Sequence, residues 1–191
     1  DHSAARASYG SYNSADVQLA KGIKLGSFTQ DYFVAYRQSE GYRDHSELEK
    51  FSLAGKWLYN WGGGSRIGII ARHHQNDAQE PGYLTFAQSR EDPEQSLSFS
   101  VTDGGKREIS QYSIHLDTQP TDKLAWGTKA YINQFDDTRF IKFSAGVSQQ
   151  ERVTEEKHYG ALTTLTYRAR ESLSVEGGLD FQHQDNKSLR Y

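Results

Sequence analysis

Apolar and polar residues alternate with a period of two along much of this chain. Between Leu173 and Gln182 the odd positions hold Leu, Val, Gly, Leu and Phe, and the even positions hold Ser, Glu, Gly, Asp and Gln. Such alternation predicts β-strands with one apolar face and one polar face. It recurs often enough to predict about eight strands and no long helix. The expected strands lie within residues 17–25, 32–36, 50–61, 67–72, 109–117, 124–132, 161–169 and 173–184.

The connections between these strands alternate in length. Short ones are expected at 25–29, 62–65, 118–122 and 170–172, and long polar ones at 40–47, 76–107 and 136–158. Antiparallel strands with short turns at one end and long polar loops at the other are typical of outer-membrane β-barrels. A structureless loop of about thirty residues is also uncommon in a compact soluble domain. The pattern favours a transmembrane barrel wall.

The average composition is that of a soluble protein. Mean hydropathy is −0.82, the net charge is −3, and no stretch reaches the roughly 20 apolar residues of a membrane-spanning helix. A barrel strand, however, needs an apolar residue only at every second position. Lys56, Arg72, Lys129 and Arg168 all fall on the polar side of their strands. A soluble β-sandwich, with the apolar side as its core, explains the alternation equally well and stays open as an alternative.

Composition excludes several other classes of protein. Aromatic residues make up 13% of the chain, which excludes a disordered tail. The absence of Cys excludes disulfides and thiolate metal sites. The near-neutral charge argues against nucleic acid as a partner. His73 and His74 are neighbours on one strand and therefore point to opposite faces, so they do not form a chelating pair.

Several segments, in order along the chain, resemble TonB-dependent outer-membrane receptors. They include Tyr9–Tyr12, Gly41–Ser46, Glu80–Thr85 with Asp92-Pro93, and Gly177–Asp180. The resemblance implies an all-β fold: an antiparallel transmembrane β-barrel, seen here as a partial segment of a 22-stranded barrel that surrounds a plug. Residues 1–191 then form one partial barrel without the plug and the C-terminal strands. A small closed eight-stranded barrel with a structural or adhesive role is the competing geometry.

The resemblance also implies a function, a location and partners. The resemblance implies transport of a scarce nutrient, an iron–siderophore complex, across the bacterial outer membrane, rather than an enzyme activity. The implied partners are the TonB energy-transducing complex, acting through a plug outside this chain, and outer-membrane lipid with lipopolysaccharide. No cofactor and no metal site of the chain's own are expected.

Arg, His and Tyr side chains near the long loops are the candidate ligand contacts. Guanidinium groups bind carboxylates through paired hydrogen bonds, and aromatic rings stack on planar groups, which suits an anionic, catechol- or carboxylate-bearing ligand. Contact with lipopolysaccharide is the alternative role for the same charges. The candidates are Arg43, His45, Arg72, Tyr83, Arg107, Arg139 and Arg152.

Overall fold

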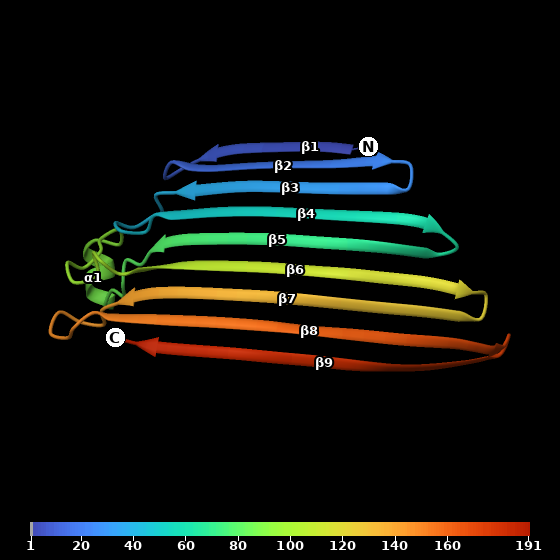
Figure 1. The fold of residues 1–191 in the computed structure, drawn as a ribbon. Coiled ribbons are helices and arrows are strands. Elements are labelled where there is room, and N and C mark those ends of the chain that lie inside the picture. The colour runs from blue at the N-terminus through green and yellow to red at the C-terminus, as the bar shows by residue number, and fades with distance from the viewer. Residues whose placement is uncertain (1) are drawn as a thin grey trace.

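Nine antiparallel strands form one sheet in which each strand pairs with its neighbours in the sequence (Figure 1). The computed structural model describes residues 2–191. One short helix, α1 (Phe86–Glu91), lies in the longest loop. The strands are β1 (His2–Gly10), β2 (Ser14–Leu25), β3 (Phe28–Ser39), β4 (Leu48–Gly62), β5 (Ser65–Gln79), β6 (Gly104–Thr121), β7 (Leu124–Ile141), β8 (Gln150–Arg170) and β9 (Leu173–Arg190).

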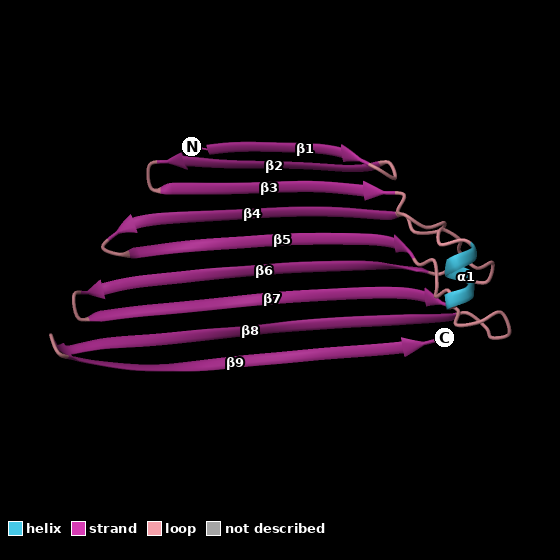
Figure 2. Ribbon diagram, turned by 180° about the vertical axis from the view of Figure 1, so that it is seen from behind, coloured by secondary structure: helices cyan, strands magenta, loops and turns pink. Residues whose placement is uncertain are grey.

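The two ends of the sheet differ in the length of their connections (Figure 2). At one end, turns 26–27, 63–64, 122–123 and 171–172 each contain two residues. At the other end lie 40–47, 80–103 with α1, and 142–149, together with the short turn 11–13. The predicted alternation of short and long connections is confirmed. The turn after β4 requires glycine, because Gly62, Gly63 and Gly64 all have positive φ.

The structure contains one strand more than the alternation predicts, and its strands run further. The extra strand is β1, whose apolar positions Ala5 and Ala7 are too small to mark a face. The predicted loops 76–107 and 136–158 shrink to 80–103 and 142–149, because β5 to β8 continue with polar residues on both faces. Pairing of main-chain groups continues there although the hydrophobic signal has ended.

Each strand presents large apolar side chains on the same face of the sheet, here called the band face. Ile141 is the one large hydrophobic residue that is buried among the described residues. The apolar side chains of the band are instead exposed, so this single layer has no hydrophobic core of its own. The exposed band includes Val17, Leu19, Leu53, Ile69, Ile114, Leu165, Val175, Leu179 and Phe181.

The apolar band crosses the hydrogen-bonded rows at an angle. One row of directly paired residues on the band face begins with Phe51 and Gln75 and ends with Glu155 and Lys187. A row that starts apolar and ends charged means that the strands tilt relative to the band, as barrel strands do. Tyr59, Trp61 and Trp126 lie at the short-turn edge of the band, where an aromatic girdle is expected.

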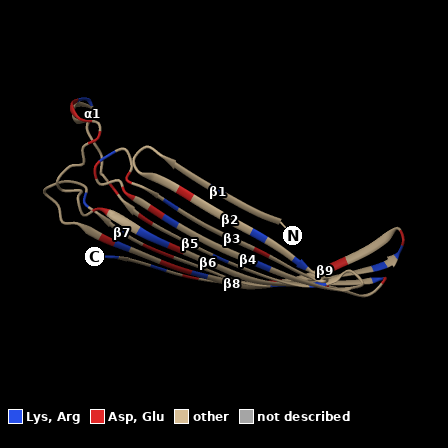
Figure 3. Cartoon of the chain, turned by 90° about the horizontal axis from the view of Figure 1, so that it is seen from above, with Lys and Arg blue, Asp and Glu red and all other residues tan. Residues whose placement is uncertain are grey.

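The opposite side, here called the polar face, holds most of the charged residues of the strands according to the pairing register. Figure 3 colours the charged positions, which recur along the strands. Lys21, on the band face near the short-turn end, donates from Nζ to Ser3 at 3.0 Å. His73 and His74 do lie on opposite faces, where they contact Ser110 and Ser52 respectively.

Neither alternative geometry forms within residues 2–191. A β-sandwich needs a second sheet against the apolar side, and all nine strands belong to one sheet. A closed small barrel needs its first and last strands to pair, whereas β1 and β9 are the two outer edges of the sheet. None of the helices in the described part of the chain is long and apolar enough to span a membrane.

Candidate functional site: an arginine row at the long-loop end

Three connections at the long-loop end contact one another and form a loop cluster, made of residues 40–47, 80–103 and 142–149. Arg43 joins the first two. Its guanidinium donates to the carbonyl oxygens of Gly82 (2.7 Å), Pro81 (3.1 Å) and Gln95 (2.7 and 3.1 Å). Nearby, His45 Nε2 lies 2.5 Å from the carbonyl oxygen of Asp103. The N–H donors of Arg43 are therefore used in hydrogen bonds to loop carbonyl oxygens and do not point toward a ligand.

The third connection holds the same loop from the other side. Gln149 Nε2 donates to the carbonyl oxygen of Thr102 at 2.9 Å and to Asp103 Oδ1 at 3.0 Å. Asp103 is only 3% exposed and Ser100 is fully buried, so the loop has a small interior of its own. A capping box, in which Thr85 and Gln88 exchange hydrogen bonds, caps the N-terminus of helix α1. The longest loop is thus a fixed structure.

Beside the loop cluster, three arginines lie directly opposite one another on the polar face of β7, β8 and β9. The register pairs Arg139 with Arg152 and Arg152 with Arg190. We call these three residues the arginine row. Like charges placed directly opposite each other across strands destabilise a sheet. A row of three therefore indicates a place where negative charge is expected from elsewhere.

Only one member of the arginine row is neutralised by a carboxylate within residues 2–191. Arg139 forms a two-point ion pair with Glu80, at 2.5 Å from Nη2 and 2.8 Å from Nε, and this contact raises the pKa of Arg139. Arg152 lies over the ring of Phe143 at 5.4 Å and donates to Gln150 at 3.0 Å. Arg190 is exposed. The row therefore carries a surplus of positive charge.

A hollow of about 240 Å³ adjoins the arginine row on the side of the loops. Arg139 and Lys142 supply cations, and Tyr83 and Phe143 supply aromatic rings. Tyr83 is 84% exposed, so its ring is free to stack on a ligand. Guanidinium groups beside exposed rings can bind a planar anion by paired hydrogen bonds and stacking. The hollow is lined by Glu80, Pro81, Gly82, Tyr83, Phe99, Asp103, Arg139, Ile141, Lys142 and Phe143.

The structure brings together three of the seven candidates from the sequence: Tyr83, Arg139 and Arg152. Arg107 lies further down the polar face, where it pairs with Asp137 at 2.9 Å. Arg72 lies deeper still, in the middle of β5.

Sequence reasoning missed Arg190, Lys142 and Phe143. The pairing register is the signal that could have identified Arg190. That register follows only when β7 and β8 are extended through the segment that was predicted as a loop.

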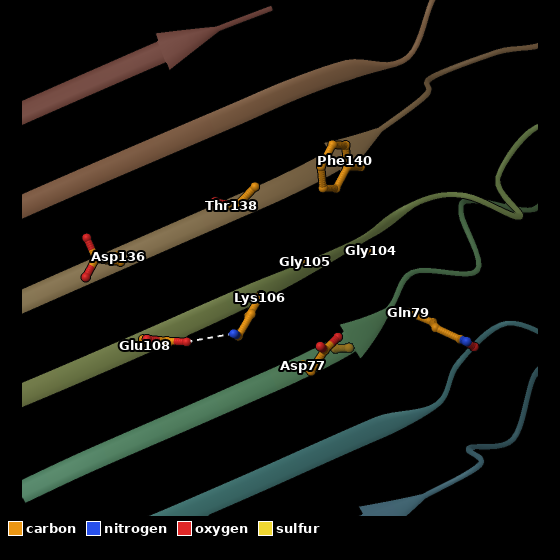
Figure 4. Close-up of a pocket in the computed structure, with 10 residues that line it drawn as sticks. Asp77, Gln79, Gly104, Gly105, Lys106, Glu108, Asp136, Thr138 and Phe140 are labelled. Atoms are coloured by element: carbon orange, nitrogen blue, oxygen red, sulfur yellow. Dashed lines mark ion pairs between the residues drawn. The ribbon is translucent and has the colours of Figure 1, made fainter.

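A different hollow, on the band face above the apolar band, has three carboxylates and one lysine among its lining residues (Figure 4). Asp77 and Asp136 lie on its two sides, and Lys106 pairs with Glu108 at 2.8 Å. That contact raises the pKa of Lys106 and lowers the pKa of the Glu108 carboxyl. The net negative charge of this lining disfavours binding of an anion. Across residues 2–191, no group of three His, Asp or Glu side chains is arranged to hold a metal ion.

Solved structures with the same fold as this chain exist, although no related sequence was found. No protein-family model and no curated protein sequence matches the chain. Among solved structures, the ferric citrate transporter FecA aligns with a TM-score of 0.77 and 16% identity, over 99% of this chain and 29% of FecA. The fold is that of a TonB-dependent receptor barrel.

Two further structures share this receptor-barrel fold. The ferric-catecholate import receptor Fiu from E. coli K12 aligns with a TM-score of 0.71 and 12% identity, over 93% of this chain and 33% of Fiu. The siderophore receptor PiuA from Acinetobacter baumannii gives 0.71 and 14%, over 96% of this chain and 30% of PiuA. The chain therefore spans about a third of each receptor barrel protein, and the predicted resemblance is confirmed for the fold.

Proposed function

We propose that residues 1–191 form part of the wall and external loops of a TonB-dependent receptor that imports an anionic iron–siderophore complex across the bacterial outer membrane. The arginine row carries this proposal. It places uncompensated guanidinium groups on the polar face at the long-loop end of a receptor-barrel fold. Long loops face outward in outer-membrane barrels, so the row lies where a ligand arrives.

The apolar band supports the outer-membrane location. Its side chains have no partner layer in this sheet, and lipid covers such a surface in a barrel. Above the band, β5 to β9 extend with polar side chains on both faces, at the height where lipopolysaccharide head groups lie. We assign those outer polar side chains to contact with lipopolysaccharide, and the arginine row to the ligand.

Capture at the arginine row needs no covalent chemistry. Arg152 and Arg190 donate paired hydrogen bonds to carboxylate or catecholate oxygens, while Tyr83 and Phe143 stack on the ligand. Arg43 and His45 act one step away, by holding the loop that carries Tyr83. Iron enters as cargo, and the chain supplies no cofactor of its own. Transfer inward would draw on TonB acting through a plug outside these residues.

A binding measurement on the intact protein tests the proposal. Arg152→Gln combined with Arg190→Gln removes two guanidinium groups from the arginine row. We expect affinity for ferric citrate or a ferric catecholate to fall about tenfold or more, since contacts to charged groups are worth about 1.5–3 kcal/mol each. Arg168→Gln is the matched control, because it lies on the same face of β8 at the opposite end. Equal affinity in both variants, or no binding of either complex by the unaltered protein, contradicts the proposal.

A further inference from the structure

One charged residue, Lys21 on β2, lies among the apolar residues of the band face within residues 2–191. Its neighbours on the same face of the strand are Val17, Leu19, Ile23 and Leu25. A lysine that faces hydrocarbon is costly, and ionisable side chains at such positions typically have a partner and a function. The charge of Lys21 therefore calls for an anion on the outward side of the sheet.

The described part of the chain gives Lys21 a neutral partner only. Its Nζ donates to Ser3 Oγ on β1 at 3.0 Å, and within residues 2–191 no carboxylate lies at ion-pair distance from it. An ammonium group has three N–H donors, so two of them remain for another acceptor. The bond to Ser3 also keeps the charge beside β1, so the side chain does not extend to the membrane surface.

Lys21 lines a groove of about 520 Å³ on the band face of β1 to β4, four strands that lie side by side in Figure 1. We call it the band groove. The pairing register divides it into two rows. The row nearer the short turns is polar and consists of Ser3, Lys21 and Tyr32. The next row toward the long loops is apolar and consists of Ala5, Leu19, Val34 and Leu53.

An aromatic pair stands beside the polar row of the band groove. Trp57 Nε1 donates to the Tyr32 hydroxyl at 3.0 Å, and that hydroxyl donates to Gln30 Oε1 at 2.5 Å. The two rings meet edge to face with their centroids 5.9 Å apart, and Gly55 leaves the room that the Trp57 ring occupies. Tyr and Trp side chains with hydrogen-bonded polar ends are typical of the level of lipid head groups. The polar row is therefore suited to a head group and the apolar row to hydrocarbon.

We propose that the band groove binds one glycerophospholipid of the inner leaflet, with its phosphate on Lys21 and an acyl chain along the apolar row. Short turns face the periplasm in outer-membrane barrels, so the polar row lies on the side of the phospholipid leaflet. The groove and the lipid then have the same polarity, with charge toward the short turns and hydrocarbon toward the bilayer centre. Phosphate oxygens accept the two remaining N–H groups of Lys21 and neutralise its charge. The small side chains of Ser3 and Ala5 leave depth for the chain.

The band groove lies on the outward face of the sheet, away from the arginine row and from the interior of the barrel. The inference rests on the outer-membrane location in the proposed function, and not on the imported ligand. β1 is an outer edge of this sheet, so a strand outside residues 1–191 is the alternative source of an anion for Lys21. The experiment below separates that source from a lipid.

Native mass spectrometry of the intact protein, released from detergent with dioleoylphosphatidylglycerol as the probe, tests the inference. We expect one phospholipid to stay bound, and its affinity to fall about tenfold or more in Lys21→Gln. Lys24→Gln is the matched control, because it removes the same charge from the polar face of the same strand. Ala5→Phe fills the apolar row and should also displace the lipid. Ala7→Phe makes the same change one row further along β1, outside the groove, and should not.

The inference is overturned if Lys21→Gln and Lys24→Gln retain the lipid equally, or if Ala5→Phe retains it fully. It is also overturned if inorganic phosphate binds as tightly as the lipid, because the groove would then contribute nothing. Coupling of Lys21 to an Asp or Glu of the intact protein by a carbodiimide would overturn it too, since a protein carboxylate would then neutralise the lysine. Lipid binding without any binding of ferric citrate or a ferric catecholate would refute the proposed function and leave this inference standing.

Discussion

The loop cluster and the barrel wall are stabilised in different ways. Loop 80–103 has buried residues of its own, Ser100 and Asp103, and side chains of two other connections donate hydrogen bonds to its carbonyl groups. The wall is held by main-chain pairing across nine strands, and its large apolar side chains remain exposed. The loops therefore carry their own tertiary contacts, whereas the apolar side chains of the wall have no protein layer against them; under the proposed function, the bilayer supplies their apolar contacts.

A charge placed on the band face should produce the largest effect. Ile69 lies in the apolar band, and Ile70 is its neighbour on the polar face. We expect Ile69→Lys to destabilise the membrane-inserted protein by about 2–4 kcal/mol, because a lysine at the bilayer midplane faces hydrocarbon.

Ile70→Lys is the matched control, with the same change of residue on the other face. The measurement is the urea dependence of folding in lipid vesicles, followed by the heat-modifiable mobility of the folded protein. Equal destabilisation by both substitutions would show that the band face does not contact lipid.

Removal of Arg43 should loosen the loop cluster and spare the wall. Arg43→Gln deletes charge-assisted hydrogen bonds to three carbonyl groups, each worth about 1.5–3 kcal/mol. We expect faster amide hydrogen exchange and proteolysis within 80–103, with unchanged exchange in β6 and β7.

Arg37→Gln, on the polar face of β3, controls for loss of charge alone. Unchanged protection of 80–103 in Arg43→Gln would mean that other contacts fix the loop.

Substitution of Glu80 should have a smaller effect than substitution of Arg43, and it should strengthen anion binding where loss of Arg152 and Arg190 weakens it. Its carboxylate neutralises Arg139 at 2.5 Å, and both side chains are about one-third exposed. Glu80→Gln should therefore cost no more than about 1 kcal/mol of stability. It should also tighten binding of citrate to the arginine row severalfold at low ionic strength, since it raises the surplus positive charge. Calorimetric titration with citrate at low and high salt measures this difference in affinity. Weaker citrate binding by Glu80→Gln than by the unaltered protein at low salt would contradict the prediction.

The smallest effect is expected for Glu108, which contacts Lys106 on the exposed part of the wall. The lowered pKa of Glu108 means that this pair contributes stability above the ordinary pKa of a glutamate, and that the contribution is lost as pH falls through the lowered pKa. Glu108→Gln should therefore flatten the pH dependence of unfolding slightly in the acidic range. An unchanged or steeper dependence in the variant would contradict this contribution of Glu108 to stability.

Strand alternation predicted the wall well, because the band face holds apolar residues and the polar face holds polar ones at alternate positions. Leu173 to Phe181 is the clearest example. The alternation predicted the long-loop end poorly, since polar residues occupy both faces there and no apolar signal marks where strands end. The extensions of β7 and β8 were missed for this reason, and with them the register that aligns Arg139, Arg152 and Arg190. Arg43 was predicted as a ligand contact, and its contacts with main-chain carbonyls could not be predicted because they depend on the folded path of 80–103.

Uptake of radioactive iron by living cells tests the central proposal most directly. Cells that express the intact protein are supplied with iron as ferric citrate or as a ferric catecholate, with and without TonB. We predict uptake of at least one complex that requires TonB, falls severalfold or more in the Arg152→Gln/Arg190→Gln variant, and is unchanged in Arg168→Gln. Uptake that is independent of TonB, or identical in all three proteins, would contradict a receptor that captures its anionic ligand at the arginine row.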